Sequence, residues 1–145
     1  MAAIKRKGDS VWNGGGKDGK GMLSTESGAV SNLSYSTGQR FGDDKGTNPE
    51  ELLAITHAGC FNMALAFRLG ADGKTPEELR TTAVVNLEQQ GADYSIIKVE
   101  LQLRGRVPGM SAEEFKKAAD EAKAGCPVSK LFKGAEITLD AQLDS

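Results

Sequence analysis

The sequence has little of what metal centres and nucleic-acid interfaces need. It contains one histidine, His57, and two cysteines, Cys60 and Cys126, that lie far apart without CxxC or HxxxH spacing. A zinc site is therefore not expected. Lysines and arginines are scattered among acidic residues, the net charge is −2 and no basic block occurs. A nucleic-acid partner is therefore not expected either.

Long apolar runs are also missing. The start, "MAAIKRKGDS", lacks the apolar region of a signal peptide. The longest uncharged run, residues 52–67, contains Thr56, His57 and Asn62 and is too short and too polar for a membrane span. We therefore expect a cytoplasmic protein with no membrane partner. In that compartment two cysteines are more often reduced, catalytic or redox-active than a structural disulfide.

The glycine-rich segment "GGGKDGKG" partly matches a phosphate-binding loop. Gly14, Gly19 and Lys20 fit the pattern, but Gly21 stands where a Ser or Thr is required and no helix pattern follows. We interpret the segment as a hairpin turn.

Residues 1–47 read as strands and turns. They are rich in Gly, Ser and Thr and contain the short β-like pieces "DSVW", "GMLSTES" and "SNLSYST". No linker separates them from the rest, and 145 residues suit one domain. We predict a single domain over residues 1–145.

The segment "NPEELLAITHAGCFNMALAFRLG" predicts one long helix over residues 48–70. Asn48 is a good N-cap, Pro49 suits the first helical position, and Glu51 completes a capping-box pattern. Gly70 is a suitable stop. Apolar residues cover almost the whole circumference, so we expect the helix to be buried on most sides, in the core or between two subunits.

After this helix the apolar period changes from 3.6 to 2. Apolar and polar residues alternate over residues 83–87 and 97–104, and the turn sequence "QQGADY" lies between them. This pattern predicts an antiparallel hairpin with one solvated face. Residues 137–143 alternate in the same way and predict a last strand.

Two further helices are expected between the hairpin and the last strand. Ser111 and Glu114 form a capping-box pattern for a helix that ends at Gly125, and Pro127 is placed to start a short one. Strands and helices are segregated rather than regularly alternating, which predicts an α+β fold.

The two cysteines are the side chains most able to carry chemistry. Cys60 lies in the middle of the long helix, and Cys126 lies at a helix junction, where unpaired backbone N–H groups favour a thiolate. Buried free cysteines are often inert, and these residues alone support an inert pair and a redox pair equally. His57 shares a helix face with Cys60, so a Cys–His pair stays open, although a hydrogen-bonded core histidine is the commoner outcome.

A buried thiol has a raised pKa unless a cation compensates. Arg40 is the nearest candidate, and an Arg held by a carboxylate such as Glu50 can bind a thiolate and a peroxide oxygen together. Ten helical residues rise about 15 Å, so Glu50 and Cys60 of one chain cannot share a site. If both act at one site, Glu50 comes from a second subunit; otherwise Arg40 and Glu50 are a surface ion pair and a helix-start carboxylate.

The segments "KGTNPEELLAITHAGCFNMALAF", "STESG" and "AKAGCPVSKLFKGAEITLD" closely resemble the osmotically inducible protein C (OsmC) family, which is related to the organic hydroperoxide resistance (Ohr) proteins. The resemblance covers essentially the whole chain, and the two cysteine motifs together are highly specific. It implies an OsmC/Ohr-like α+β fold with antiparallel sheets around a buried central helix. It also implies an intertwined homodimer with active sites at the subunit interface.

The family's functional residues carry over position by position. Cys60 matches the peroxidatic cysteine, and Cys126 matches the resolving one. Glu50 matches the active-site glutamate, and Arg40 matches the arginine of the most similar members. The alternative site cations are Lys17 and Lys20.

The resemblance implies a cysteine-based peroxidase without haem, metal or other cofactor. The Cys60 thiolate, stabilised by Arg40, would attack a hydroperoxide, release an alcohol and become a sulfenic acid. Cys126 would then form an intramolecular disulfide, which an external dithiol, small or lipoyl-type, would reopen.

Apolar residues near the site, such as Phe61 and Met63, would favour organic hydroperoxides over hydrogen peroxide. Two alternatives stay open. One is a non-catalytic dimeric protein that binds small hydrophobic ligands and merely packs its cysteines. The other is a redox sensor that uses the same thiols to signal.

Overall fold

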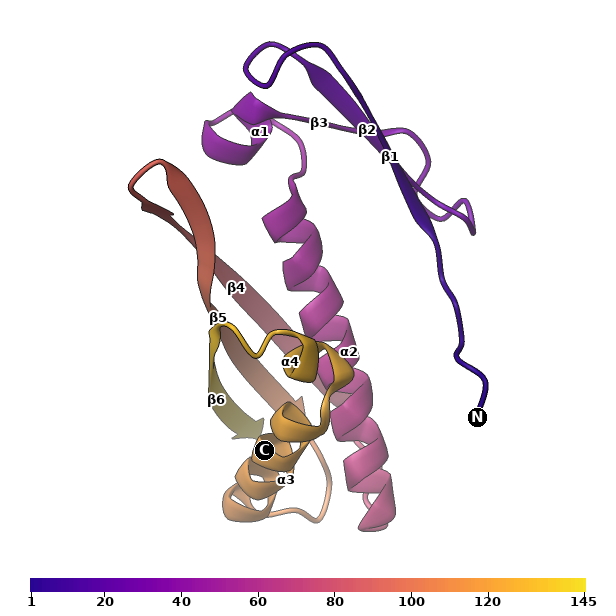
Figure 1. Cartoon of the computed structure of the whole chain (residues 1–145). Helices are drawn as coiled ribbons and strands as arrows, with labels where there is room; N and C mark the ends of the chain where they lie inside the picture. Colours follow the sequence, from indigo (N-terminus) through magenta and orange to yellow (C-terminus); the bar gives the residue numbers. More distant parts are fainter. The chain divides into compact units, whose positions relative to one another are not determined.

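In the computed structural model, which describes residues 1–145, the chain forms two compact units, Met1–Leu52 and Leu53–Ser145 (Figure 1). Each unit contains one three-stranded sheet, and helix α2 (Pro49–Ala71) begins in the first unit and continues into the second. Strands and helices are segregated, so the predicted α+β class is confirmed. The prediction of one domain over residues 1–145 stays a prediction.

The first unit is an antiparallel sheet followed by a short helix. Strands β1 (Gly8–Asn13), β2 (Lys20–Thr25) and β3 (Leu33–Ser36) pair in the order β1-β2-β3. The glycine-rich segment is the turn between β1 and β2, as predicted. Helix α1 (Thr37–Phe41) was not predicted, because five residues without an apolar period give no helix signal.

The second unit contains the sheet β4-β5-β6. Strands β4 (Glu78–Gln90) and β5 (Asp93–Arg106) form the predicted antiparallel hairpin, which turns at Gly91 with a φ of 67°. Strand β6 (Glu136–Asp144) pairs with β5 in parallel. The prediction of antiparallel sheets is therefore wrong for this pair.

The connection between β5 and β6 accounts for the parallel pairing. It contains helices α3 (Ala112–Gly125) and α4 (Pro127–Leu131), which lead the chain back so that β6 runs in the same direction as β5. The capping box predicted for α3 is present, because the Ser111 side chain accepts from the Glu114 N–H and the Glu114 carboxylate accepts from the Ser111 N–H.

One hydrophobic core lies in the second unit, where α2 and α3 pack on the same face of the sheet. The alternating side chains of β5 point into it, and one face of each helix covers them. Its most buried members are Phe61, Leu65, Leu69, Val99, Leu101, Leu103, Phe115, Ala118 and Ala119.

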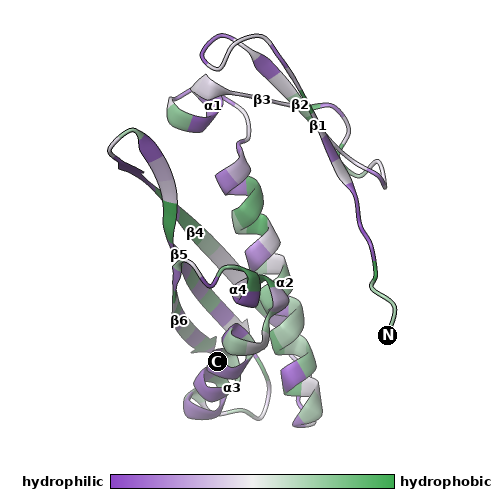
Figure 2. Cartoon of the chain, in the orientation of Figure 1, coloured by the Kyte–Doolittle hydropathy of each residue, from purple (hydrophilic) through white to green (hydrophobic).

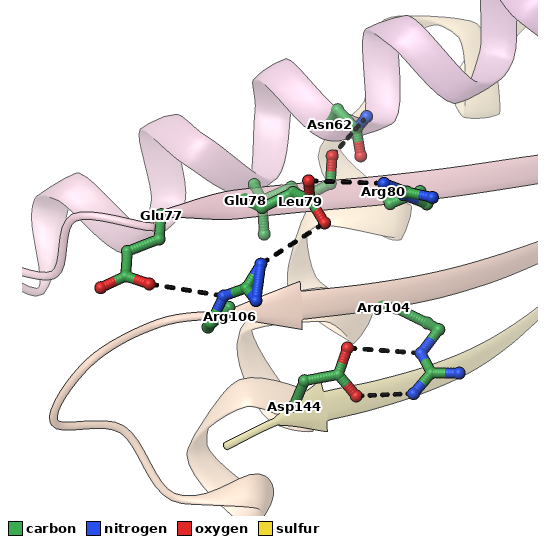
Figure 3. Close-up of polar contacts among 8 residues, drawn as sticks. All are labelled: Asn62, Glu77, Glu78, Leu79, Arg80, Arg104, Arg106 and Asp144. Carbon is green, nitrogen blue, oxygen red and sulfur yellow. Dashed lines mark hydrogen bonds and ion pairs between the residues drawn. The ribbon is translucent and has the colours of Figure 1, made fainter.

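Polar contacts fix α2 to the edge of this sheet. The Asn62 side chain of α2 donates from Nδ2 to the Leu79 backbone carbonyl at 3.3 Å, and the Thr81 hydroxyl donates to Asn62 Oδ1 at 2.6 Å. Figure 3 shows the Asn62–Leu79 contact and, farther across the sheet, the Arg104–Asp144 pair, which joins β5 to β6. The Asn62 amide therefore holds α2 in register with β4.

Helix α2 buries one face and exposes the opposite one. His57, Phe61, Leu65 and Leu69 repeat every four residues and are fully buried. On the opposite face of the second unit's part of α2, the exposed apolar side chains are Ile55, Met63 and Phe67. Figure 2 shows that apolar residues extend over most of the helix. The prediction of burial on most sides is wrong for a single chain, because one sheet and its helices cover one face; sharing between two subunits stays a prediction.

By length and composition, α2 is compatible with a membrane span. It has 23 residues, with a mean hydropathy of 1.4 over its most apolar window. The expectation that the segment is too short is wrong for the complete helix, because α2 extends beyond the uncharged run at both ends. Core helices of globular proteins meet the same criterion, so the helix by itself assigns no membrane role.

Candidate functional site

The two cysteine sulfurs are in contact. Cys60 lies in the middle of α2, and Cys126 is the residue between α3 and α4. The Cys126 Sγ–H donates to the Cys60 Sγ at 3.2 Å, and both cysteines are free thiols. Cys126 is fully buried and Cys60 is half-buried. A sulfur pair at this distance can become a disulfide with only a small shift.

Burial and two neighbouring groups shift the pKa of the Cys60 thiol. Burial has the largest effect and raises the pKa. The backbone N–H of Val128, in the first turn of α4, donates to the sulfur and lowers the pKa in part, while the Cys126 thiol raises it. The net effect raises the pKa of Cys60, and no cation is among the causes, so within this unit the thiolate is disfavoured.

Cys126 lies at a helix junction, as predicted, and is the N-cap of α4, but its sulfur makes no capping hydrogen bond. The helix N–H that was expected to favour a Cys126 thiolate belongs to Val128 and serves Cys60 instead. The sequence "CPV" marks where α4 begins, yet the partner of its N–H groups is set by packing against α2. The spacing of residues in the sequence therefore does not predict which sulfur accepts from the Val128 N–H.

Arg40 and Glu50 form an ion pair in the first unit. Arg40, on α1, donates from Nη2 to Glu50 Oε1 at 2.6 Å and from Nε to both carboxylate oxygens at 3.1 and 3.2 Å. Glu50, at the start of α2, is only 8% exposed, whereas the Arg40 side chain is 38% exposed, so the pair is partly buried. The thiols belong to the second unit, and the role of this pair beside them stays a prediction.

The alternative cations also lie in the first unit. Lys17 is in the turn between β1 and β2, and Lys20 is the first residue of β2; both side chains are exposed. Their proposed role as site cations stays a prediction.

His57 is a hydrogen-bonded core residue, which is the commoner of the two outcomes considered from the sequence. Its Nε2 lies 2.8 Å from Ser129 Oγ, its ring packs edge-on against Phe132, and burial lowers its pKa, which keeps it neutral at pH 7. Its Nδ1 is buried without a hydrogen-bond partner. A Cys–His nucleophile pair is therefore not formed.

Ser129 and Val128 were not predicted from the sequence. Both lie in α4, where Ser129 is the third residue after Cys126 just as His57 is the third residue before Cys60. This spacing was the available signal, because residues three apart share a helix face.

An apolar pocket of about 250 Å³ lies beside the histidine. Phe132 is one of its walls and also contacts His57. The full lining is Leu53, Val85, Ile96, Leu131, Phe132, Gly134 and Ala135. Of the apolar neighbours expected from sequence, Phe61 is enclosed in the core and Met63 is exposed. No group of three or more His, Cys, Asp or Glu side chains is arranged to hold a metal ion.

Comparison with protein families places most of the chain in one family. Residues 42–141 match the model of the OsmC-like protein family. Peroxiredoxin OsmC of Escherichia coli K12 is 49% identical over 142 residues, covering 98% of this chain and 99% of the relative. The organic hydroperoxide resistance protein OhrA of Bacillus subtilis is 35% identical over 99 residues, covering 67% of this chain and 68% of the relative.

Solved structures share the fold. An OsmC-like protein from Mycoplasma pneumoniae superposes with a TM-score of 0.79 at 16% identity, covering 99% of this chain and 100% of the other. An organic hydroperoxide resistance protein from Elizabethkingia anophelis superposes with a TM-score of 0.76 at 23% identity, covering 99% and 100%. The arrangement of two small sheets and helices thus matches OsmC and Ohr structures.

Proposed function

Because the chain belongs to the OsmC-like protein family, we propose that it is a thiol peroxidase that reduces organic hydroperoxides, and hydrogen peroxide less efficiently. The observation that carries the proposal is the 3.2 Å contact between two free thiols from distant parts of the chain. The names of the relatives, a peroxiredoxin and organic hydroperoxide resistance proteins, support the same substrate class.

The proposed cycle has three steps. The thiolate of Cys60 attacks the outer peroxide oxygen, the O–O bond breaks, and the alkoxide takes a proton and leaves as an alcohol. Cys126 then attacks the sulfur of the Cys60 sulfenic acid, forming the S–S bond and releasing water. An external dithiol reduces this disulfide by thiol exchange and becomes a disulfide itself. A small or lipoyl-type dithiol suits this last step.

The thiolate needs more stabilisation than one N–H supplies. We assign this role to Arg40 of a second copy of the chain, held in place by Glu50. A guanidinium beside the sulfur lowers the thiol pKa and can also donate to the peroxide oxygen. The active site in this proposal lies at a subunit interface.

The exposed face of α2 supports a homodimer. Ile55, Met63 and Phe67 form an apolar stripe with the four-residue spacing of one helix face, and Gly59 lies within it. A Cβ added at Gly59 would meet no atom within 4 Å, so the surface there is open. A second copy of α2 could approach this glycine closely and cover the stripe.

The apolar pocket and the free thiols fit the rest of the proposal. A volume of about 250 Å³ beside Phe132 suits a short alkyl group, whose burial favours organic hydroperoxides over hydrogen peroxide. Two reduced cysteines in contact suit the reducing cytoplasm, where we place the reaction.

Replacing each cysteine by serine tests the proposal. Cys60→Ser should abolish turnover of an organic hydroperoxide with a dithiol reductant, because the nucleophile is gone. Cys126→Ser should consume about one equivalent and then accumulate oxidised Cys60, because the sulfenic acid has no partner. Wild-type protein should lose two thiols to one equivalent of hydroperoxide, with the Cys60–Cys126 link found by peptide mapping.

Two results would count against the proposal. Thiols that stay free in hydroperoxide would indicate a protein that packs its cysteines and binds hydrophobic ligands. A disulfide that forms once but does not cycle with any dithiol would indicate a redox sensor.

A further inference from the structure

A buried polar bridge joins α2 and α4 next to the thiols. His57 Nε2 and Ser129 Oγ lie 2.8 Å apart; the histidine is fully buried and the serine is 7% exposed. His57 precedes Cys60 by three residues, and Ser129 follows Cys126 by three. Because residues three apart share a helix face, the bridge and the sulfur contact are neighbouring contacts between the same two segments.

Two hydrogen bonds join α4 to α2. The Val128 N–H donates to the Cys60 sulfur, and the Ser129 hydroxyl bonds to His57, while Val128 also packs against the hydrophobic core. The helix has five residues, of which Ser129 is the buried one, and its last residue, Leu131, is 77% exposed. The position of Cys126, which caps this helix, therefore depends on how α4 is held against α2. The Ser129 hydroxyl holds it there through a side chain, whereas the Val128 N–H bonds to the reacting Cys60 sulfur itself.

Packing alone does not account for a histidine at this place. Nδ1 is buried without a partner, and an apolar side chain of similar size would leave no unpaired nitrogen. Phe132 packs edge-on against the ring and holds its plane. What the histidine adds is a directed bond to Ser129, which fixes geometry rather than adding stability.

We propose that His57 and Ser129 are a positioning pair that holds Cys126 against Cys60 and so sets the rate of disulfide closure. This role rests on the proposed function, in which the Cys126 sulfur attacks the Cys60 sulfenic acid, the S–S bond forms, the S–O bond breaks and water leaves. Attack requires the incoming sulfur to lie in line with the breaking bond, so a small displacement of α4 slows it.

The test compares two routes to the same disulfide. Ser129→Ala removes the bond, and Ser129→Thr is the matched control that keeps the hydroxyl. His57→Leu and His57→Gln form a second pair, because a Gln amide can reach the place of Nε2. Each variant is treated with one equivalent of an organic hydroperoxide, and separately with diamide. Diamide adds to one thiolate, and the second thiol then displaces it from that sulfur, so the disulfide forms without a sulfenic acid and diamide leaves as the hydrazine. Thermal unfolding shows that each variant is folded.

We expect disulfide closure in Ser129→Ala and His57→Leu to be roughly tenfold to a hundredfold slower by both routes. With excess hydroperoxide, these variants should also accumulate Cys60 sulfinic acid, because an unresolved sulfenic acid is oxidised further. The rate at which the first equivalent of hydroperoxide is consumed should change much less. Ser129→Thr and His57→Gln should recover most of the rate of disulfide closure.

The possible outcomes distinguish the positioning role of His57 and Ser129 from the proposed peroxidase function. Wild-type closing rates in folded Ser129→Ala and His57→Leu, by both routes, would overturn the positioning pair and leave the peroxidase proposal standing. A wild-type protein that ignores hydroperoxide, yet closes with diamide at a rate that Ser129→Ala lowers, would support the positioning pair and refute the peroxidase.

Discussion

At the scale of single residues, the chemistry depends on what surrounds the Cys60 sulfur. Burial and the Cys126 thiol raise its pKa, and the Val128 N–H offsets only part of that rise. A group that lowers the pKa further is therefore needed for rapid reaction near pH 7, since the thiolate is the nucleophile. Arg40 is the residue to which we assign this task.

Replacing Arg40 tests the assignment. Arg40→Met should raise the pKa of Cys60 and lower kcat/KM for an organic hydroperoxide by roughly a hundredfold, because a positioned cation is lost. The pKa is measured from the pH dependence of Cys60 alkylation. Lys20→Met is the matched control, since Lys20 is the exposed alternative cation at the start of β2. The reverse pattern would transfer the role to the lysine.

The neutral His57 makes stability depend on pH. Burial lowers its pKa below the usual 6.5, so the unfolded chain takes up a proton at higher pH than the folded chain. The contribution of His57 to the free energy of unfolding should be at its maximum above pH 6.5. It should fall as the pH drops below 6.5, until His57 is protonated in the folded protein too. His57 is the only histidine, so this window isolates it.

Denaturant unfolding at pH 7.5 and pH 5.5 measures the effect. The wild type should lose more stability between these values than His57→Gln, which cannot titrate there. An equal loss in both proteins would show that His57 does not couple folding to pH.

At the scale of elements, the close approach of α3 to the sheet depends on Gly105 of β5. A Cβ there would lie 2.8 Å from Phe115 Cε1 and closer still to Cζ, and Phe115 is fully buried in α3. Gly105→Ala should destabilise the protein by about 1–3 kcal/mol, because the ring has no room to move in the core.

A glycine in open space provides the control. Gly125→Ala, at the end of α3, meets no atom within 4 Å and should leave stability unchanged or raise it by up to about 1 kcal/mol, because alanine favours a helix more than glycine does. Chemical denaturation of both variants gives the comparison. Equal effects would mean that the contact between α3 and β5 is looser than the structure indicates.

Elements whose signals are local were predictable from the sequence. The Ser111 capping box and the alternation in β4 and β5 depend on neighbouring residues, and the structure confirms them. The parallel direction of β6 was not predictable, because alternation is the same for either direction. The bonds from Val128 to Cys60 and from Ser129 to His57 join distant segments, so only packing reveals them.

At the scale of the whole molecule, the exposed stripe of α2 predicts self-association. Met63→Glu should shift a dimer toward monomer, because a charge in an apolar interface loses its hydration. Sedimentation velocity over a range of concentrations measures the change. Val84→Glu, at an exposed position of β4, is the control and should leave the assembly unchanged.

A monomeric wild type at every concentration would contradict the predicted dimer. The proposed site would then need its cation from the same chain. A dimer that Met63→Glu leaves intact would place the interface elsewhere.

A disulfide between Cys60 and Cys126 would also constrain the unfolded chain. The two residues are separated by 66 positions, so a bond between them closes a long loop. Closing a loop of this length removes conformational entropy from the unfolded state and stabilises the fold by about 4 kcal/mol. The oxidised protein should therefore resist unfolding better than the reduced one, and each reduction by a dithiol should return it to the less stable form.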